Sequence, residues 1–83
     1  MAVILLPSLL ATEAGGRSRF EVEAATVEAA LRTLPVADLI FDERGRLRSL
    51  VNVYVDGVDV RDRGGFGAPA DGEIRIVAAI AGG

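Results

Sequence analysis

The sequence has 83 residues, of which 51% are hydrophobic and 25% are charged. This composition fits one small globular domain rather than a disordered chain. The sequence contains no cysteine and no histidine, and all nine basic residues are arginine. The usual general base, the thiolate and imidazole metal ligands and the amine that forms Schiff bases are therefore missing. The net charge of −3 argues against a nucleic-acid-binding protein, which normally has a basic face.

The first ten residues are strongly apolar and need a structural explanation. A secretory signal would begin with a basic segment, but the first basic residue is Arg17. A membrane span needs about 20 apolar residues, whereas Pro7 and Ser8 interrupt this run. We therefore expect residues 3–6 to form a strand buried on both faces, in a soluble cytoplasmic protein that does not contact a membrane.

A second strand is predicted after a turn at residues 13–16. Apolar and charged residues alternate with period two over residues 19–24, which places Phe20, Val22 and Ala24 on one face. The two strands are therefore expected to form a hairpin.

The period then changes to that of a helix over residues 27–34. Thr26 is a suitable N-cap, Glu28 lies in the first turn, where the helix dipole favours an anion, and Pro35 ends the helix. A helix of about two turns is not stable alone, so we expect it to pack on the sheet.

The connection over residues 36–49 is predicted from its composition. The apolar residues 39–41 are expected to tuck under the domain, and residues 42–45 to form a turn. Three arginines within residues 44–48 form a basic cluster, but acidic residues lie beside them. This mixture favours a solvated turn over a nucleic-acid site.

Three strands are predicted in the rest of the chain. Residues 50–55 are rich in β-branched side chains, and Asp56-Gly57 is a strong hairpin turn that leads to a short return strand over residues 58–60. Alternating residues predict the last strand over residues 73–81.

The predicted order is therefore two strands, a helix and three strands. It describes an α+β fold in which a mixed sheet of about five strands is wrapped over one main helix. The β-grasp, or ubiquitin-like, fold is the simplest arrangement with this order. We expect residues 1–81 to form this domain, and Gly82 and Gly83 to form a flexible tail.

Three candidate sites within the domain fail on chemical grounds. The glycine-rich residues 64–67 lack the Lys-Ser/Thr and the helix that a phosphate-binding loop needs. Asp56, Asp59 and Asp62 surround a tight turn but supply too few oxygen ligands for a hard cation. The serines have no histidine or lysine to activate them. No catalytic residue and no metal ligand is therefore assigned.

The final Gly82-Gly83 pair is the remaining chemical feature. Two residues without a Cβ atom make the thinnest possible peptide, which could enter a narrow channel and place the Gly83 carboxylate beside a reactive phosphate. Ordering both glycines costs about 2–4 kcal/mol, so we expect a partner to dock elsewhere on the domain. The competing interpretation is a frayed terminus without function.

The C-terminal half also contains a series of short motifs, which are Gly45-Arg46-Leu47, Leu50 to Val55, Asp59-Val60-Arg61, Gly64-Gly65, Ala70 to Glu73 and Ala79 to Gly83. In this order they resemble the ubiquitin-like sulfur carriers of the ThiS/MoaD group. The sequence is most similar to the actinobacterial carriers that serve cysteine synthesis. The resemblance covers residues 1–44 by pattern only, and the helix and the connection over residues 35–44 are shorter than those carriers usually have.

The resemblance implies that other proteins act on Gly83. An adenylating enzyme would use ATP and Mg²⁺ to convert the Gly83 carboxylate to an acyl-adenylate. Sulfide or a persulfide would then replace AMP and leave a thiocarboxylate. Ala81, Gly82 and Gly83 would enter the active site of the partner. The chain itself would bind no cofactor and would be a carrier, not an enzyme.

The resemblance leaves the sulfur acceptor open. In the cysteine branch the acceptor is an aminoacrylate on a PLP-dependent cysteine synthase, and a metalloprotease that releases the product is a further candidate partner. In the molybdopterin branch the chain would be the small subunit of molybdopterin synthase. The chain could instead be a ubiquitin-like protein conjugated to lysines through Gly83, or a β-grasp interaction module whose tail carries no sulfur.

A docking surface is predicted from apolar residues expected on the outer face of the sheet. Exposed apolar groups that cluster on a small protein mark interaction sites. We expect Leu6, Val55 and Val77 to form a partner-facing patch, with Phe66 at its rim. The competing interpretation is that these side chains cap a thin core or are covered by a loop.

Overall fold

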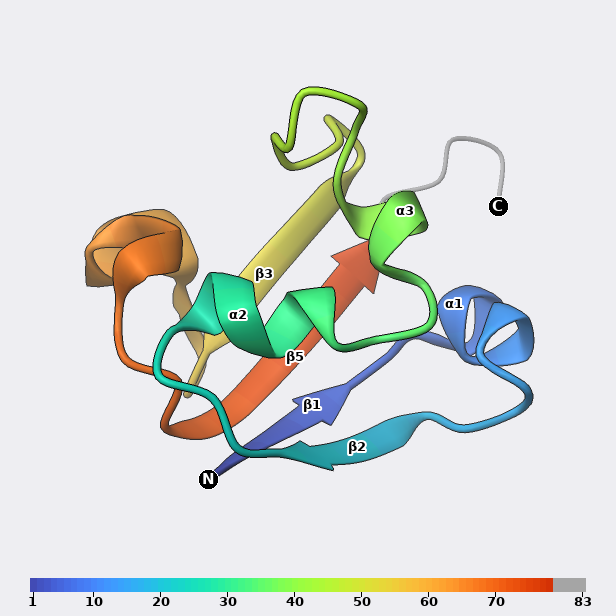
Figure 1. Cartoon of the computed structure of the whole chain (residues 1–83), viewed down its shortest axis with the longest axis horizontal. Helices are drawn as coiled ribbons and strands as arrows, with labels where there is room; N and C mark the ends of the chain where they lie inside the picture. Colours follow the sequence, from blue (N-terminus) through green and yellow to red (C-terminus); the bar gives the residue numbers. More distant parts are fainter. Residues whose placement is uncertain (79–83) are drawn as a thin grey trace.

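The computed structural model describes residues 1–78. The elements, in chain order, are β1 (Ala2–Leu5), α1 (Ser8–Glu13), β2 (Arg19–Val22), α2 (Val27–Arg32), α3 (Ala37–Ile40), β3 (Val51–Val55), β4 (Val58–Asp59), the 3₁₀ segments η1 (Val60–Arg63) and η2 (Gly65–Gly67), and β5 (Gly72–Ala78) (Figure 1). The predicted tail and the last three residues of the predicted final strand lie outside the described residues.

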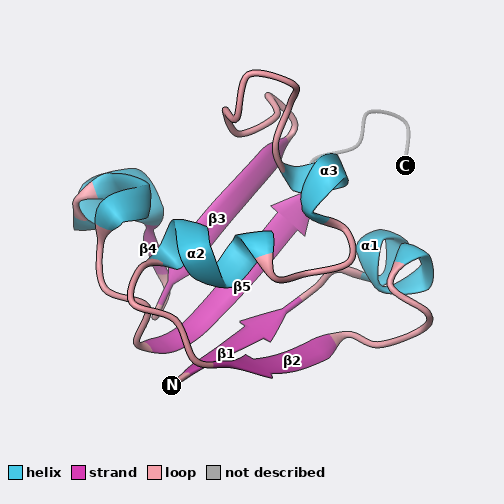
Figure 2. Ribbon diagram, viewed as in Figure 1, coloured by secondary structure: helices cyan, strands magenta, loops and turns pink. Residues whose placement is uncertain are grey.

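The five strands form one mixed sheet in the order β2-β1-β5-β3-β4. β1 and β5 are parallel neighbours at its centre, with Ile4 opposite Ile74, and the other pairs are antiparallel. α2 lies across the strands (Figure 2). The predicted α+β arrangement of a mixed five-stranded sheet with a helix over it is confirmed.

The hydrophobic core lies between the sheet and the helices. The inner sides of the three central strands β1, β5 and β3 carry side chains that are at most 7% exposed, which are Ala2, Ile4, Ile74, Ile76, Val51, Val53 and Val55. From the other layer, α2 contributes Val27, Ala30 and Leu31, each with 0% exposure. Burial of this apolar surface is the main favourable term in the folding of a domain of this size.

The predicted helix and its cap are confirmed. The Thr26 Oγ1 atom accepts a hydrogen bond from the Ala29 amide at 3.2 Å, which satisfies one of the amides left free at a helix start. Glu28 and Arg32 form an exposed ion pair at 3.0 Å along the same helix. α2 ends at Arg32, two residues before the predicted end, but Leu34 still packs in the core with 4% exposure.

Two short helices lie where the sequence predicts no helix. α1 lies inside the predicted hairpin, between the antiparallel strands β1 and β2, and its N-cap Pro7 makes no side-chain capping bond. α3 lies within the connection over residues 36–49, where Ile40 and Phe41 are buried as expected. Leu39 of α3 differs from this expectation, because 41% of its surface is exposed.

The start of β5 is fixed by the β3–β4 turn. Asp56 and Gly57 both have positive φ, of 50° and 83°, as the tight hairpin turn predicted there requires. The Asp56 amide donates to the Glu73 carbonyl at 2.8 Å, and the Asp56 Oδ1 atom accepts from the Glu73 amide at 2.9 Å. Gly72 beside them has a φ of 82°, and a Cβ atom there would lie 2.5 Å from the Asp56 carboxylate oxygens.

Candidate functional site at the end of strand β5

Strand β5 is the last described element before the residues that are predicted to enter the active site of a partner. Ala81, Gly82 and Gly83 lie outside the described residues. The structure therefore defines the site through its last described residue, Ala78, and through the surface around it.

Two of the four residues expected to form the docking patch are in the core instead. Leu6 is 7% exposed and Val55 is 1% exposed, so the expected exposure of these two side chains is wrong. Val55 has the same strand phase as Val51 and Val53, and this phase faces the helices. Leu6 follows the last residue of β1 and belongs to the same buried cluster.

Val77 has the predicted orientation, whereas Phe66 lies elsewhere. Val77 alternates with the buried Ile76 and is 38% exposed on the open face of the sheet. Phe66 is partly buried and packs edge-to-face against the core residue Phe41, with ring centroids 5.7 Å apart. The fold therefore does not bring the four predicted residues together into one patch.

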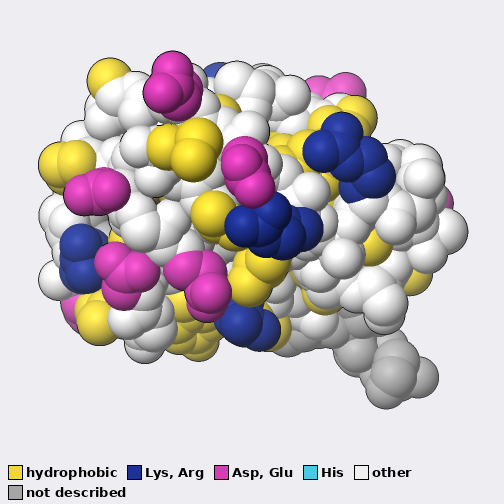
Figure 3. Space-filling model, turned by 90° about the horizontal axis from the view of Figure 1, so that it is seen from below, with side chains coloured by type: hydrophobic (Ala, Val, Ile, Leu, Met, Phe, Trp, Pro, Cys, Tyr) yellow, Lys and Arg dark blue, Asp and Glu magenta, His cyan; other side chains and the backbone are white. Residues whose placement is uncertain are grey.

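The open face of the sheet is built from the outward residues of the same strands. The pairing register places Leu5, Arg75 and Tyr54 in one row across β1, β5 and β3, and Val77 opposite Asn52. Seen from below the view of Figure 1, the molecule carries acidic and basic side chains interspersed with hydrophobic ones (Figure 3). Near the end of β5 a small hollow of about 230 Å³ opens, lined by Leu5, Leu6, Pro7, Arg75, Ile76, Val77 and Ala78.

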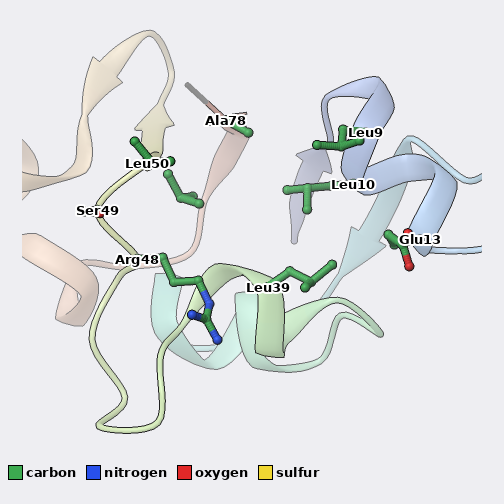
Figure 4. Close-up of a pocket in the computed structure, with 9 residues that line it drawn as sticks. Leu9, Leu10, Glu13, Leu39, Arg48, Ser49, Leu50 and Ala78 are labelled. Atoms are coloured by element: carbon green, nitrogen blue, oxygen red, sulfur yellow. The ribbon is translucent and has the colours of Figure 1, made fainter. Parts of the chain in front are cut away.

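A larger apolar pocket lies beside Ala78 (Figure 4). Its volume is about 590 Å³, and its lining comes from α1, α3, the segment before β3 and the end of β5, with residues Leu9, Leu10, Glu13, Leu39, Arg48, Ser49, Leu50, Val51 and Ala78. Three of these side chains, which we call the leucine rim, are highly exposed: Leu9 at 53%, Leu39 at 41% and Leu50 at 53%.

The walls of this pocket are held by backbone hydrogen bonds. The Arg48 amide donates to the Ile40 carbonyl at 2.9 Å, and the Val51 amide donates to the Arg48 carbonyl at 3.0 Å. The Arg48 guanidinium also donates to the Asp38 carbonyl at 3.0 Å. Leu10 and Val51, which are 5% and 7% exposed, link the pocket to the core. The pocket is therefore part of the folded domain and not a gap between loose segments.

Sequence patterns did not reveal Leu5 or the leucine rim. Four consecutive apolar residues at 3–6 give no strand phase, so the pattern does not show that Leu5, rather than Leu6, faces outward. For Val55 a signal was present, because Asn52 and Tyr54 alternate with three valines over residues 51–55. The leucine rim depends on α1 and α3, which are too short to show a helical period.

The strongest electrostatic feature lies away from this pocket, at the β4 strand. Asp59 binds the guanidinium of Arg61 through both carboxylate oxygens, at 3.0 and 2.8 Å, and accepts from the Arg61 amide at 2.9 Å. The side-chain hydrogen bond from Arg61 is the main cause that lowers the pKa of Asp59 to about 2. These contacts cap η1 and serve the loop rather than a reaction.

Two kinds of feature are absent from residues 1–78. No group of three acidic side chains there could hold a metal ion. No helix in that part of the chain is long and apolar enough to cross a membrane.

A sheet with two parallel central strands, antiparallel outer strands and a helix across one face is the β-grasp arrangement of ubiquitin-like proteins, so the predicted fold is confirmed. No family model matches the sequence. The chain is 32% identical to the sulfur carrier protein CysO of Mycobacterium tuberculosis over an alignment of 89 positions, which covers 96% of both proteins. It belongs to the CysO family of sulfur carrier proteins.

Solved structures agree with this assignment. The crystal structure of Mycobacterium tuberculosis CysO matches with a TM-score of 0.80 at 26% identity, over 96% of this chain and 100% of that one. A chain of the Amycolatopsis orientalis BexX/CysO complex matches with a TM-score of 0.83 at 28% identity, over 100% of both chains. The small archaeal modifier protein SAMP1 of Haloferax volcanii has a TM-score of 0.72 at 28% identity, over 99% of this chain and 98% of that one.

Proposed function

We propose that this protein carries sulfur as a thiocarboxylate on Gly83. The observation that supports it most is the 32% identity to a sulfur carrier protein over 96% of the chain, together with the Gly82-Gly83 pair that follows β5. In this proposal the chain is a substrate of other enzymes, and its own side chains position the tail rather than react.

The chemistry requires activation of the Gly83 carboxylate. A carboxylate is a poor acyl donor because its oxygen is a poor leaving group. An adenylating enzyme with Mg²⁺ joins one carboxylate oxygen to the α-phosphorus of ATP and releases pyrophosphate. Hydrosulfide then attacks the acyl carbon, and the C–O bond to AMP breaks. The products are AMP, a proton and the Gly83 thiocarboxylate, whose sulfur is the nucleophile for the next enzyme.

The side-chain composition of the chain suits this role. An acyl-adenylate is attacked by any nearby amine or thiolate, and the sequence has neither lysine nor cysteine. The activated Gly83 therefore meets no such side chain of its own domain. Its uses depend on partners, and we propose a PLP-dependent cysteine synthase as the acceptor and a metalloprotease that frees the product, in the cytoplasm where ATP is available.

Intact-mass measurement tests the proposal. The protein is incubated with an adenylating enzyme, ATP, Mg²⁺ and sulfide, and we expect the mass change of one oxygen replaced by sulfur. The matched control carries one extra residue after Gly83, which removes the reactive carboxylate from its place but leaves the described domain untouched. A control that gains sulfur equally well, or a wild-type chain that gains none with an enzyme active on another carrier, contradicts the proposal.

A second function, conjugation to lysines of other proteins through Gly83, is supported by the similarity to the modifier SAMP1. It uses the same acyl-adenylate, with an amine in place of sulfide as the nucleophile. Covalent adducts of larger mass in cell extracts, absent for the chain extended beyond Gly83, are the expected sign. Their absence under conditions that give the thiocarboxylate leaves the carrier function alone.

A further inference from the structure

The length of the tail limits where a partner enzyme can lie. Residues 79–83 follow Ala78, and five residues span at most about 17 Å when fully extended. The reacting carbon of Gly83 is therefore within this distance of Ala78 in any complex. A standard interface covers about 800 Å² on each protein, which corresponds to a patch about 30 Å across. The surface around Ala78 is therefore within reach of an enzyme that reacts with Gly83.

The leucine-rimmed pocket, with a volume of about 590 Å³, is an apolar feature of that surface. Leu9, Leu39 and Leu50 are all more than 40% exposed, although burial of a leucine side chain is favourable by about 1.5–3 kcal/mol. The floor residues Leu10 and Val51 are already packed, and backbone bonds hold the wall. A preformed apolar pocket loses little entropy when a partner fills it, which is the property of an interface hot spot.

We propose that the leucine-rimmed pocket receives an apolar side chain of the adenylating enzyme when that enzyme takes the Gly83 tail. The proposal rests on the proposed function, because it assigns the docking site for the same tail. The adenylating enzyme is the chosen partner because every later use of Gly83 needs its carboxylate activated first. The apolar anchor supplies binding energy that the two glycines, without side chains, cannot supply.

The charges at the pocket define the partner further. Glu13 lies at the end of α1, and Arg48 lies on the other side of the leucine rim, near α3 (Figure 4). The surface of the enzyme that fits this pocket has one apolar side chain. On one side of it lies a basic group that faces Glu13, and on the other an acidic group that faces Arg48. Such pairs at a rim contribute mainly to orientation and to the rate of association.

Steady-state adenylation kinetics with Leu9→Ser/Leu39→Ser test the proposal. Both side chains are exposed, so the domain is expected to fold normally. With the enzyme that thiocarboxylates the wild-type chain, and pyrophosphate release as the readout, we expect KM for the carrier to rise about tenfold or more, equal to about 1.4 kcal/mol, with kcat unchanged. The matched control is Val58→Ser, which removes a side chain that is 40% exposed in β4. The register places it at the opposite end of the sheet, so KM is expected to stay at the wild-type value.

The outcomes separate this proposal from the proposed function. A wild-type chain that is never adenylated refutes the carrier function and the docking site together. A wild-type chain that is adenylated, with a double variant of unchanged KM, overturns the docking site alone. The docking site is also overturned if the pocket has another occupant. A dimer in sedimentation that the leucine variants dissociate would show that a second copy of the chain fills it. Changes in the NMR shifts of the Leu9 and Leu39 amides on Ile80→Ala, without any enzyme, would show that the chain's own tail fills it.

Discussion

The two ends of β5 are held in different ways. At the first end, Asp56 binds the backbone of Glu73 through both its amide and its carboxylate, and Gly72 is close enough that no side chain fits. At the other end, Ala78 lies beside a pocket whose rim of three leucines faces water. The first end uses directional polar bonds, whereas the second leaves apolar surface without a partner in the described part of the chain.

This difference separates the residues that specify the fold from those available for binding. Hydrogen bonds and a required positive φ fix one register of β5. The Gly72 end of the strand therefore determines where Ala78, at its other end, lies. Exposed leucines add nothing comparable to the stability of the free domain. Mutations in β5 and in the turn beside it therefore test this difference.

Ile74→Ala is expected to have the largest effect on stability. Ile74 is 0% exposed and lies between β1 and β3 in the sheet, so truncation leaves a cavity and costs about 2–5 kcal/mol. Val77→Ala is the matched control on the outward face of the same strand, and we expect a change within about 0.5 kcal/mol. Urea unfolding followed by circular dichroism measures both. Equal losses for the two variants would show that the two faces of β5 are not distinct.

Gly72→Ala is expected to cost about 2 kcal/mol, from the strain of an alanine at positive φ and the displaced carboxylate bond. The new Cβ atom would lie 2.5 Å from the Asp56 oxygens at a φ of 82°. Gly67→Ala is the control, because a Cβ atom at Gly67 meets no atom within 4 Å and its φ is not positive. Thermal unfolding compares the two. If Gly72→Ala has the same Tm as the wild type, the contact between Asp56 and the start of β5 does not contribute to stability.

The smallest effect is expected for the pH dependence of stability that Asp59 causes, in strand β4 of the same hairpin. Its folded pKa of about 2 is below the ordinary value of about 3.9. A lowered pKa stabilises the folded state above about pH 4, and this contribution is lost as the pH falls through about 2. We expect the Tm of the wild type to exceed that of Asp59→Asn at pH 5, and the difference to shrink toward zero by pH 2. If the difference in Tm between the two proteins does not change with pH, the substitution acts through packing and not through the charge of Asp59.

The sequence predicts the strands well where alternation gives a phase. The three valines that alternate with Asn52 and Tyr54 define the buried side of β3, and Ile74 and Ile76 define that of β5. The turn at Asp56-Gly57 is also predictable, because few residue pairs adopt positive φ so easily. These local signals are sufficient for the β-grasp order of elements.

The surface around the end of β5 could not be predicted in the same way. Leu5 and Leu6 are chemically alike, and only the three-dimensional register decides that Leu5 faces outward. The leucine rim combines residues from α1, α3 and the segment before β3, which are far apart in the chain. No local sequence pattern predicts that such residues lie close together, because their proximity depends on how the chain folds across the sheet.

The central position of β5 has a consequence for the order of events in the cell. β5 is the last strand to be synthesised among the described residues, but it pairs with β1, the first one, and separates β1 from β3. Contacts between residues so distant in the chain form slowly, and before they form, the β1–β2 and β3–β4 pairs keep open edges that favour aggregation. The Leu9 side of the pocket follows β1 and the Leu50 side precedes β3, and β5 pairs with both of these strands. The pocket is therefore complete only in a chain whose last described strand has paired with β1 and β3.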